Sequence, residues 1–450
     1  MLDRASVTYL VDSLHSRRVV RIKAIASSKE GTQVTQSVTQ ATQAAQKQVR
    51  IPGDRLQELL EHLVGRKGIR HAILAIETID GSVSWNGAAG AAYADGTPMS
   101  PNIPYFIASV DKLYTATVIL KLYEQRRLSL DAPLSAYLPP ELTDRIHVRG
   151  GVDHSDQITV GHLLSHTSGL ADYLEDRPRG GRSLIERLIE GGGDLTLSAE
   201  SAMSTVRDDL APHFPPQDPM SERSKVRYCD TNYHLLIAII EALHRRPLHE
   251  VFNELIFAPV GMGHTYSLGV SEPLAPTPES ATLWAGDQAI DLPQILVSLR
   301  SIYSTGGDQI ASLRALLGGE LFDDPATLGL MTRCWKRFGL PLDMAALRAP
   351  SSPIEYGFGM MRFALPRVYT PFRPIPPVIG HTGSTVSWLF YCPHYGVLFA
   401  GTVDEVSAGA TPFRIIVPRV LRAIEDANRG WQNVGDTLTK AAKEQVNAPV

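Results

Sequence analysis

The pattern of apolar positions predicts that the folded part of this chain opens with one helix and two strands. In DRLQELLEHLVGRKG, which begins at Asp54, leucines recur at helical spacing and glycines follow where the helix should end. We interpret Asp54 as the cap of this helix. The next stretch, HAILAIETIDGSVSWNGAAGAAYADG, indicates two strands joined by a hairpin turn at Asp80 and Gly81.

Beyond these strands the pattern becomes helical, and near the C-terminus it returns to strands. YFIASVDKLYTATVILKLYEQRRLSL, residues 105–130, is apolar nearly all round in its helical part, which is typical of a buried helix. NYHLLIAIIEALHRRPLHEVFNELIF predicts two helices separated at Pro247. PPVIGHTGSTVSWLFYCPHYGVLFAGTVDE indicates consecutive strands, and TPFRIIVPRVLRAIEDA a closing helix. The predicted fold class is α+β: a mainly antiparallel sheet built from both chain ends, flanked by helices, with an inserted helical subdomain.

The polar stretches at the two ends set the predicted domain limits. Residues 27–49 are rich in Gln, Thr, Ser and Ala, a composition too polar to bury a face of its own. We therefore expect one folded domain between two terminal segments. The predicted limits are a poorly ordered leader over 1–50, the domain over 51–430 (sheet part 51–108 and 355–430, helical part 109–354) and a tail over 431–450.

The composition excludes several classes of function. Of 450 residues, 44% are hydrophobic and 20% charged, with a net charge of -4, so no basic surface for nucleic acid or an anionic membrane is expected. No run approaches the roughly 18–20 apolar residues of a membrane span, and the N-terminus lacks the apolar core of a secretion signal, so we expect a cytoplasmic protein. Cys229, Cys334 and Cys392 are scattered, which argues against a disulfide framework or a zinc site.

The SVDK sequence in the first long helix carries the first candidate chemistry. Ser109 and Lys112 are three residues apart, so their side chains share one face, and the helix dipole would favour negative charge on the serine oxygen. Burial should lower the pKa of Lys112 and make it a general base. Taken alone, the pair can also be explained without catalysis, by a serine that caps the helix and a lysine that reaches solvent.

Two further motifs follow in the chain. Tyr228 in RYCDTNYHLL precedes an apolar helix, and an ammonium beside its phenol would pull the pKa below about 10 and allow proton transfer. GHTGS, which includes His381 and Ser384, opens a strand along which a ligand could lie, and a backbone N–H there could complete an oxyanion hole. Alone, each is explained as well by packing or by a tight turn.

In the order Ser-x-x-Lys, Tyr-x-(Asn/Asp) and (Lys/His)-Thr-Gly, the three motifs resemble those of the serine β-lactamase and penicillin-binding-protein superfamily. The likeness is to the branch of class C β-lactamases, D-alanyl-D-alanine carboxypeptidases and β-lactamase-like esterases. Longer phrases, among them ITVGHLLSHTSGL, IFAPVGMGHT and YGFGM, extend it over residues 55–425. The resemblance implies the β-lactamase/DD-peptidase-like fold.

The resemblance also implies roles. Ser109 would be the acyl-accepting nucleophile, Lys112 its proton acceptor, and Tyr228 the acid and base that protonates the leaving group and activates water. The mechanism would pass through an acyl-enzyme and use no metal or cofactor. The backbone N–H groups of Ser109 and Ser384 would form the oxyanion hole. The residues that would line the substrate are Asp230, His381, Thr382 and Gly383.

The chain departs from the superfamily pattern at two of these positions. Asp230 stands in place of the usual asparagine, and a carboxylate accepts hydrogen bonds but cannot donate them. It could pair with Lys112, keep the lysine charged and shift the role of base towards Tyr228. His381 replaces a lysine and is mostly uncharged near neutral pH, so it would hold a substrate carboxylate less firmly. Both changes weaken the case for β-lactams and for peptides that end in a carboxylate, and they are compatible with neutral esters. Carboxypeptidases of this branch can also carry His-Thr-Gly, so the histidine alone does not decide between these substrates.

Other residues near the motifs have structural interpretations. Val386 stands where relatives often have glycine, and its bulk is expected to narrow the acyl pocket. His166 in HTSGL is interpreted as framework, with Gly169 at the helix stop. For four aromatic residues core packing is favoured over a place in the pocket: Tyr105, Tyr356, Phe358 and Trp388.

The sequence thus predicts a serine hydrolase that acts through Ser109, an esterase or amidase on a small-molecule ester or amide, without nucleic-acid or membrane partners. Three enzymatic alternatives remain open, namely a D-alanyl-D-alanine carboxypeptidase, a class C-like β-lactamase and an acyltransferase. A fourth is a catalytically silent scaffold protein of the same fold, although the complete set of Ser109, Lys112 and Tyr228 argues against it.

Overall fold

The computed structural model describes residues 49–66, 68–190, 193–338, 354–365, 367, 370 and 372–429, and the statements below refer to these. The predicted leader over 1–50, apart from residues 49 and 50, and the predicted tail over 431–450 lie outside the described residues. None of the described helices is both long and apolar enough to cross a membrane.

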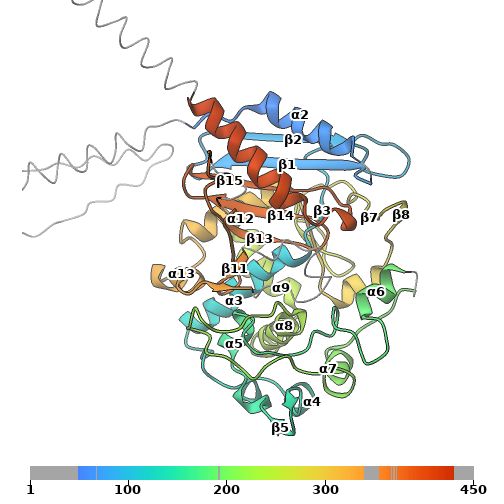
Figure 1. Ribbon diagram of the computed structural model, residues 1–450, viewed down its shortest axis with the longest axis vertical. Helices are drawn as coiled ribbons and strands as arrows, with labels where there is room; N and C mark the ends of the chain where they lie inside the picture. Colours follow the sequence, from blue (N-terminus) through green and yellow to red (C-terminus); the bar gives the residue numbers. More distant parts are fainter. Residues whose placement is uncertain are drawn as a thin grey trace, which may run out of the picture. The chain divides into compact units, whose positions relative to one another are not determined.

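One eight-stranded sheet forms the centre of the folded unit (Figure 1). Every neighbouring pair of its strands is antiparallel. In spatial order, the strands are β10 (Lys336–Arg337), β11 (Ile354–Tyr356), β12 (Met361–Phe363), β13 (Val378–Thr382), β14 (Trp388–Cys392), β15 (Val397–Thr402), β1 (His71–Thr78) and β2 (Ser84–Gly90). The prediction of a sheet built from both ends of the chain is confirmed. The sheet also includes β10, which lies within the predicted helical part, residues 109–354.

The predicted hairpin joins β1 to β2, and a hydrogen-bonded turn closes it. The Asp80 carboxylate accepts hydrogen bonds from the Thr78 hydroxyl at 2.6 Å and from the Ser82 backbone N–H at 3.1 Å. On its other side β1 pairs with β15, with Ile73 opposite Thr402. The first and the last strand of the chain are therefore neighbours.

Side chains of β1 are buried on both faces of the sheet, which explains its continuous apolar sequence. Ile73 and Ala75 belong to the core shared with the helical part. Ala72, Leu74 and Ile76 alternate with them and belong to a second core. Because successive side chains of a strand point to opposite faces, this one strand contributes to both layers.

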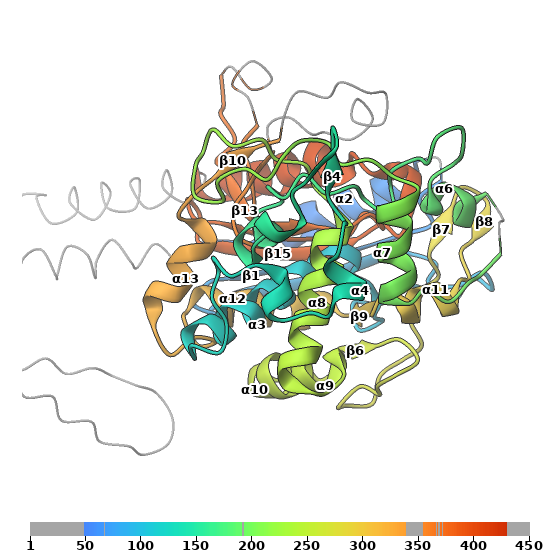
Figure 2. The same cartoon turned by 90° about the horizontal axis from the view of Figure 1, so that it is seen from below.

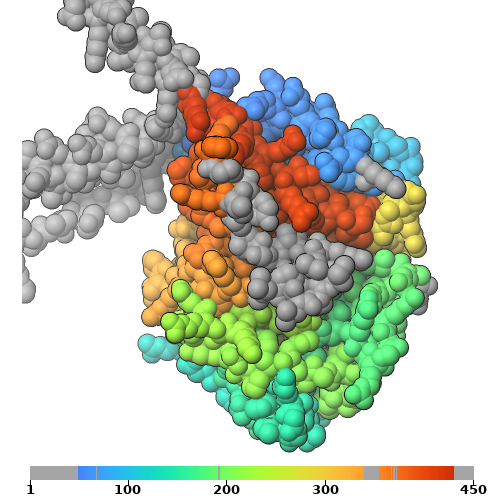
Figure 3. Space-filling model, viewed as in Figure 1, coloured from blue at the N-terminus to red at the C-terminus, as the bar shows by residue number. Residues whose placement is uncertain are grey.

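Helices cover both faces of the sheet. α2 (Gly53–Val64) and the closing helix, residues 411–429, cover one face, and α12 (Gly306–Leu317) packs on the other against β1, β14 and β15. The space-filling view shows the first described residues, in blue, beside the closing helix, in red, at one end of the unit (Figure 3). The predicted cap at Asp54 is wrong: α2 begins one residue earlier, after Pro52, and Asp54 lies in its first turn.

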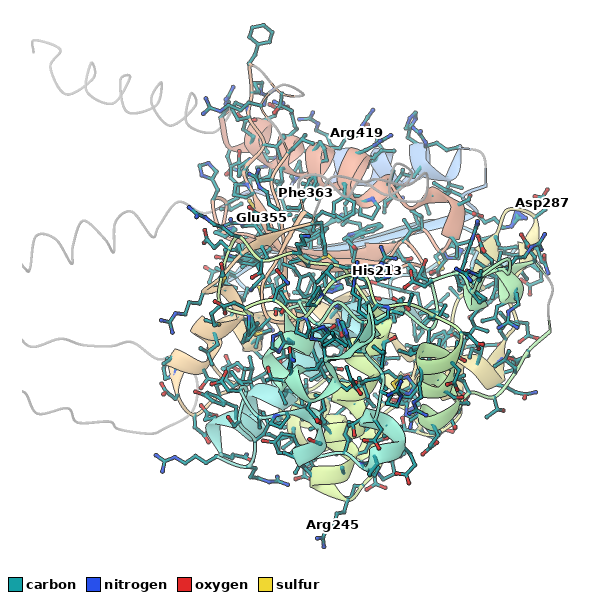
Figure 4. The ribbon with its side chains drawn as sticks, turned by 60° about the horizontal axis from the view of Figure 1, so that its bottom comes forward. His213, Arg245, Asp287, Glu355, Phe363 and Arg419 are labelled. Carbon is teal, nitrogen blue, oxygen red and sulfur yellow. The ribbon has the colours of Figure 1, made fainter. Side chains whose placement is uncertain are left out.

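The inserted helical part lies below the sheet and carries most of the remaining elements. Its longest helix, α8, contacts α3, α5 and α7 (Figure 2). Arg245, which follows α8, lies at the opposite end of the folded unit from Arg419 of the closing helix, so α8 runs away from the sheet (Figure 4). The helices are α3 (Lys112–Glu124), α4 (Pro140–Thr143), α5 (Val160–Leu164), α6 (Leu184–Ile189), α7 (Ala199–Asp208), α8 (Asp230–His244), α9 (Leu248–Phe252), α10 (Ala258–Val260), α11 (Pro293–Ser298) and α13 (Pro325–Thr332).

Three two-residue or three-residue strands form a small separate sheet, in the order β3 (Tyr105–Phe106), β9 (Ile302–Ser304) and β6 (Tyr266–Ser267). The two remaining pairs are β4 (Val148–Arg149) with β5 (Val152–Asp153), and β7 (Trp284–Ala285) with β8 (Gln288–Ala289). β3 ends two residues before Ala108, so this small sheet anchors the chain just ahead of α3.

α5, the helix of the HTSGL phrase, ends earlier than its glycine suggested. It stops at Leu164, and the chain turns at His166, whose φ is 56°. Gly169 is required for a different reason, because a Cβ there would lie 1.9 Å from the Phe214 backbone oxygen.

Replacing Gly401 of β15 with alanine should strongly destabilise the fold. An added Cβ would lie 2.0 Å from the Ile73 backbone oxygen and 2.6 Å from Cζ2 of Trp388, and the strand cannot move away without breaking its ladder. We expect the free energy of unfolding, measured by urea denaturation, to fall by about 2 kcal/mol or more.

The matched control is Gly409→Ala, where no atom lies within 4 Å of the added Cβ. Its free energy of unfolding should change by less than about 0.5 kcal/mol. Equal stability of the two variants would contradict the packing of β15 against β1.

Candidate active site

Ser109 lies in a single turn of 3-10 helix, Ala108–Asp111, that leads directly into α3. The preceding residue, Ala108, has a φ of 45°, so the chain bends sharply just before the serine. Ser109 itself is partly exposed. The serine therefore sits at the N-terminal end of a buried helical segment, where the helix dipole favours negative charge on its oxygen.

Lys112 connects Ser109 to Asp230. Its Nζ donates a hydrogen bond to Ser109 Oγ at 2.9 Å and another to Asp230 Oδ1 at 2.7 Å. Lys112 is 5% exposed and is the first residue of α3, while Asp230 is the first residue of α8. The contact thus joins the starts of two helices that lie more than a hundred residues apart in the chain.

The prediction of a lowered pKa for Lys112 is wrong, because burial is not the only influence on this side chain. Burial does disfavour the ammonium, but the Asp230 carboxylate, with a smaller contribution from Asp111, raises the pKa of Lys112 well above its usual value. An opposite charge at hydrogen-bond distance outweighs the loss of hydration. The side chain is therefore an ammonium in the resting site, as the pairing with Asp230 suggested.

Tyr228 lies over Lys112, whose Nζ is 5.2 Å from the centroid of the tyrosine ring. Among the described residues, its buried hydroxyl has no hydrogen-bond partner of normal geometry. Burial raises the pKa of the Tyr228 phenol, and the nearby Lys112 only partly opposes this. The expectation of a pKa below 10 is wrong, because desolvation is the larger effect, and the phenol is neutral.

His381 is buried near the end of β13 and is neutral. Its Nδ1–H donates to the Thr382 backbone oxygen at 2.8 Å, so Nε2 accepts from the Tyr356 hydroxyl at 3.1 Å. Burial, reinforced by the charge of Lys112, lowers the pKa of His381 to about 3. A histidine in this setting offers no positive charge to a substrate at neutral pH.

The strand motif lies against the segment that carries Ser109. A Cβ added at Gly383 would be 2.5 Å from the Ile107 backbone oxygen and 2.8 Å from Ala108 Cβ, so only glycine permits this approach. Thr382, at the end of β13, and Ser384 flank this glycine. The structure therefore places the predicted Thr-Gly-Ser motif and the predicted Ser-x-x-Lys motif side by side.

Val386 does not narrow the site as predicted. It is 1% exposed and packs in the core between the sheet and the helices α2 and 411–429. Its φ of 64° directs the side chain into that core. Tyr105, Phe358 and Trp388 are also buried, as expected of core residues.

His166 contacts the site through Tyr228, with the two ring centroids 4.5 Å apart. Its Nδ1 accepts hydrogen bonds from the Cys229 backbone N–H at 3.2 Å and from the Asn232 side-chain amide at 3.0 Å. Burial keeps the pKa of His166 well below its usual value. The neutral ring therefore holds the segment that carries Tyr228, which agrees with a framework role.

Sequence reasoning missed two residues beside the site. The ring of Tyr233 lies 5.4 Å from Lys112 Nζ, and its spacing of three residues from Asp230 on α8 was a signal that could have identified it. Asp172 accepts the Asp230 backbone N–H at 2.7 Å, and nothing in the sequence indicated this contact. Among the described residues, no group of three or more His, Cys, Asp or Glu side chains could hold a metal ion.

In this site a serine is hydrogen-bonded to the lysine three residues further on, a tyrosine ring lies over the lysine, and a Thr-Gly-Ser turn lies alongside. Together these features form the motif set of one class of proteins. The chain belongs to the Beta-lactamase family, whose model matches residues 56–408. It is 28% identical to the putative penicillin-binding protein PbpX of Bacillus subtilis (strain 168) over 279 residues, which is 60% of each chain. It is 36% identical to esterase EstB of Burkholderia gladioli over 125 residues, 27% of this chain and 30% of EstB.

The fold is shared with the D-amino acid amidase of Ochrobactrum anthropi SV3, solved with D-phenylalanine. The TM-score is 0.64 at 21% identity, and the match covers 83% of this chain and 99% of the amidase chain. This likeness concerns the fold alone. The chain spans less than two thirds of the length of PbpX and of EstB.

Asp230→Asn should lower the pKa of Lys112. Without the carboxylate, burial becomes the main influence on the ammonium, and we expect the pKa to fall. The titration of the Nζ signal in protein labelled with [15N]lysine measures this, and Lys112→Met assigns the signal.

Glu186→Gln, which removes the partner of the exposed Arg177, is the control and should leave the Lys112 signal unchanged. A Lys112 pKa in Asp230→Asn equal to that of the unmodified protein would show that Asp230 does not hold the lysine charged.

Proposed function

We propose that this protein is a serine hydrolase that cleaves small esters or amides through an acyl-enzyme on Ser109. The observation that carries the proposal is the contact of Lys112 Nζ with both Ser109 Oγ and Asp230 Oδ1, beneath the ring of Tyr228. Membership of the Beta-lactamase family supports it. Hydrolases with a serine nucleophile need such a group to take the serine proton.

The charge state of the pair requires a step before attack. Lys112 first passes a proton to Asp230 Oδ1, 2.7 Å away, which leaves a neutral amine and a carboxylic acid. A substrate that excludes water favours this neutral pair, since ion pairs lose stability in a dry site. The amine of Lys112 then takes the proton of Ser109 Oγ as the oxygen attacks the carbonyl carbon.

Tyr228 is the proton donor for the leaving group. Its neutral phenol donates a proton to the leaving oxygen or nitrogen as the bond to the acyl carbon breaks, and the proton on Lys112 replaces it. Water then attacks the acyl-enzyme, passes a proton to the same groups and frees Ser109. Backbone N–H groups of Ser109 and Ser384 hold the carbonyl oxygen in both steps.

Neutral substrates fit this site better than anionic ones. Asp230 accepts hydrogen bonds only, His381 is uncharged, and Lys112 is already paired. A substrate carboxylate therefore finds no free cation among these residues. The names of EstB and of the D-amino acid amidase agree with an esterase or amidase. The second candidate is a carboxypeptidase or β-lactamase, since PbpX is named a putative penicillin-binding protein. The neutral His381 argues against this candidate, because it offers no positive charge to a substrate carboxylate.

Ser109→Ala should abolish both turnover and covalent labelling. The experiment compares a fluorophosphonate probe, short-chain p-nitrophenyl esters and a chromogenic cephalosporin on the unmodified protein and the variant. We expect labelling and ester turnover in the unmodified protein, and a fall in turnover of at least about a thousand-fold in the variant.

Ser204→Ala, which changes an exposed serine on α7, is the control and should retain full activity. Rapid cephalosporin hydrolysis would replace the esterase proposal with a β-lactamase. No labelling and no turnover on any substrate would favour a silent scaffold protein.

Asp230→Asn should also change which substrates are accepted. The variant removes the negative charge of Asp230, which repels a substrate carboxylate in the unmodified protein. We expect the preference in kcat/KM for p-nitrophenyl butyrate over the p-nitrophenyl monoester of succinate to fall about ten-fold. An unchanged preference would show that Asp230 does not select against anionic acyl groups.

A further inference from the structure

Two buried hydroxyl groups join the turn after β13 to the segment before Ser109. The Thr385 hydroxyl donates to the Phe106 backbone oxygen at 2.8 Å, and the Ser387 hydroxyl donates to the Ile107 backbone oxygen at 2.7 Å. Thr385 is 2% exposed and Ser387 is fully buried. The bonded residues are 279 and 280 positions apart in the chain, so local structure cannot hold these segments together.

Both segments have unusual backbone conformations at this contact. Ala108 has a φ of 45°, and Val386, which is β-branched, has a φ of 64°. Such a conformation is unfavourable for a residue other than glycine and persists only where its surroundings hold it. Two backbone hydrogen bonds close the turn, both at 3.0 Å. The Gly383 N–H donates to the Ser387 backbone oxygen, and the Val386 N–H donates to the Gly383 backbone oxygen.

We propose that Thr385 and Ser387 are positioning residues that fix the backbone N–H groups of Ser109 and Ser384 relative to each other. This inference rests on the proposed function, in which those two groups form the oxyanion hole. The accepting carbonyls belong to the two residues just before Ala108, and the donors lie one and three residues after Ser384. The two hydroxyl bonds therefore join the segment just before Ser109 to the turn just after Ser384.

The physical reason is that an oxyanion hole acts only when its donors are in place before the charge develops. Its two N–H groups come from segments at distant positions in the chain, and a displacement of about 1 Å costs a large factor in rate. A hydroxyl that bonds a carbonyl across the contact restricts both segments at once. A purely structural role would stabilise the fold without affecting the transition state.

The test compares Thr385→Val, which keeps the side-chain shape, and Ser387→Ala with the unmodified protein. Four quantities are measured: kcat and KM on p-nitrophenyl acetate, the Kd of benzeneboronic acid, and the thermal midpoint. The boronic acid forms a tetrahedral adduct with a nucleophilic serine, so its affinity reports on the oxyanion hole. Thr385→Ser is the conservative variant that restores the hydroxyl.

The control is Ser298→Ala on α11, which removes a buried hydroxyl bonded to the Gln294 backbone oxygen at 2.8 Å, away from the site. We expect Thr385→Val and Ser387→Ala to lower kcat about ten- to a hundred-fold, with KM changed less than about two-fold. Boronic acid affinity should fall by a similar factor, Thr385→Ser should recover most of the loss, and Ser298→Ala should retain full activity.

Kinetic constants and boronic acid affinity equal to those of the unmodified protein, in both variants, would overturn the inference and leave the proposed function intact. A lower thermal midpoint with unchanged kcat would also overturn it. Should Thr385→Val not fold, Ser387→Ala, which removes a single hydroxyl, decides the question alone. An unmodified protein whose Ser109 takes no fluorophosphonate would overturn the proposed function and this inference with it.

Discussion

The ladder between β1 and β15 joins the two ends of the chain, and the place of every site residue depends on it. β15 aligns β14, and β14 aligns β13, whose end carries the Thr-Gly-Ser turn. α12 packs on β1 and β15 and so fixes the helical part against the same strands. Close contacts between backbones make this ladder sensitive to a single methyl group, as at Gly401.

The contact of Lys112 with Asp230 decides the electrostatics of the site. Two charges that are mostly removed from water compensate each other at 2.7 Å, whereas either one alone would be costly to bury. The same carboxylate that keeps the lysine charged also occupies its ammonium group. One difference from the superfamily pattern, aspartate in place of asparagine, thereby sets both the charge state of Lys112 and the availability of its ammonium group.

The rest of the site is kept neutral by burial. Tyr228 and Tyr356 have raised pKa values, and those of His166 and His381 are lowered, in each case chiefly through desolvation. A layer of uncharged rings thus surrounds the ion pair of Lys112 and Asp230. In such surroundings a proton transfer between Lys112 and Asp230 changes the local charge more than it would in water.

The sequence by itself determined what depends on local spacing and on periodicity. The Asp80 turn, the strands of the last hundred residues and the shared face of Ser109 and Lys112 follow from neighbouring residues, because turn and helix geometry are local. Tertiary structure alone decided the direction of the Lys112 pKa shift, the burial of Val386 and the bonds made by Thr385 and Ser387. Each of these depends on which distant segments meet, since charge, desolvation and hydrogen bonding are set by neighbours in space rather than in the chain.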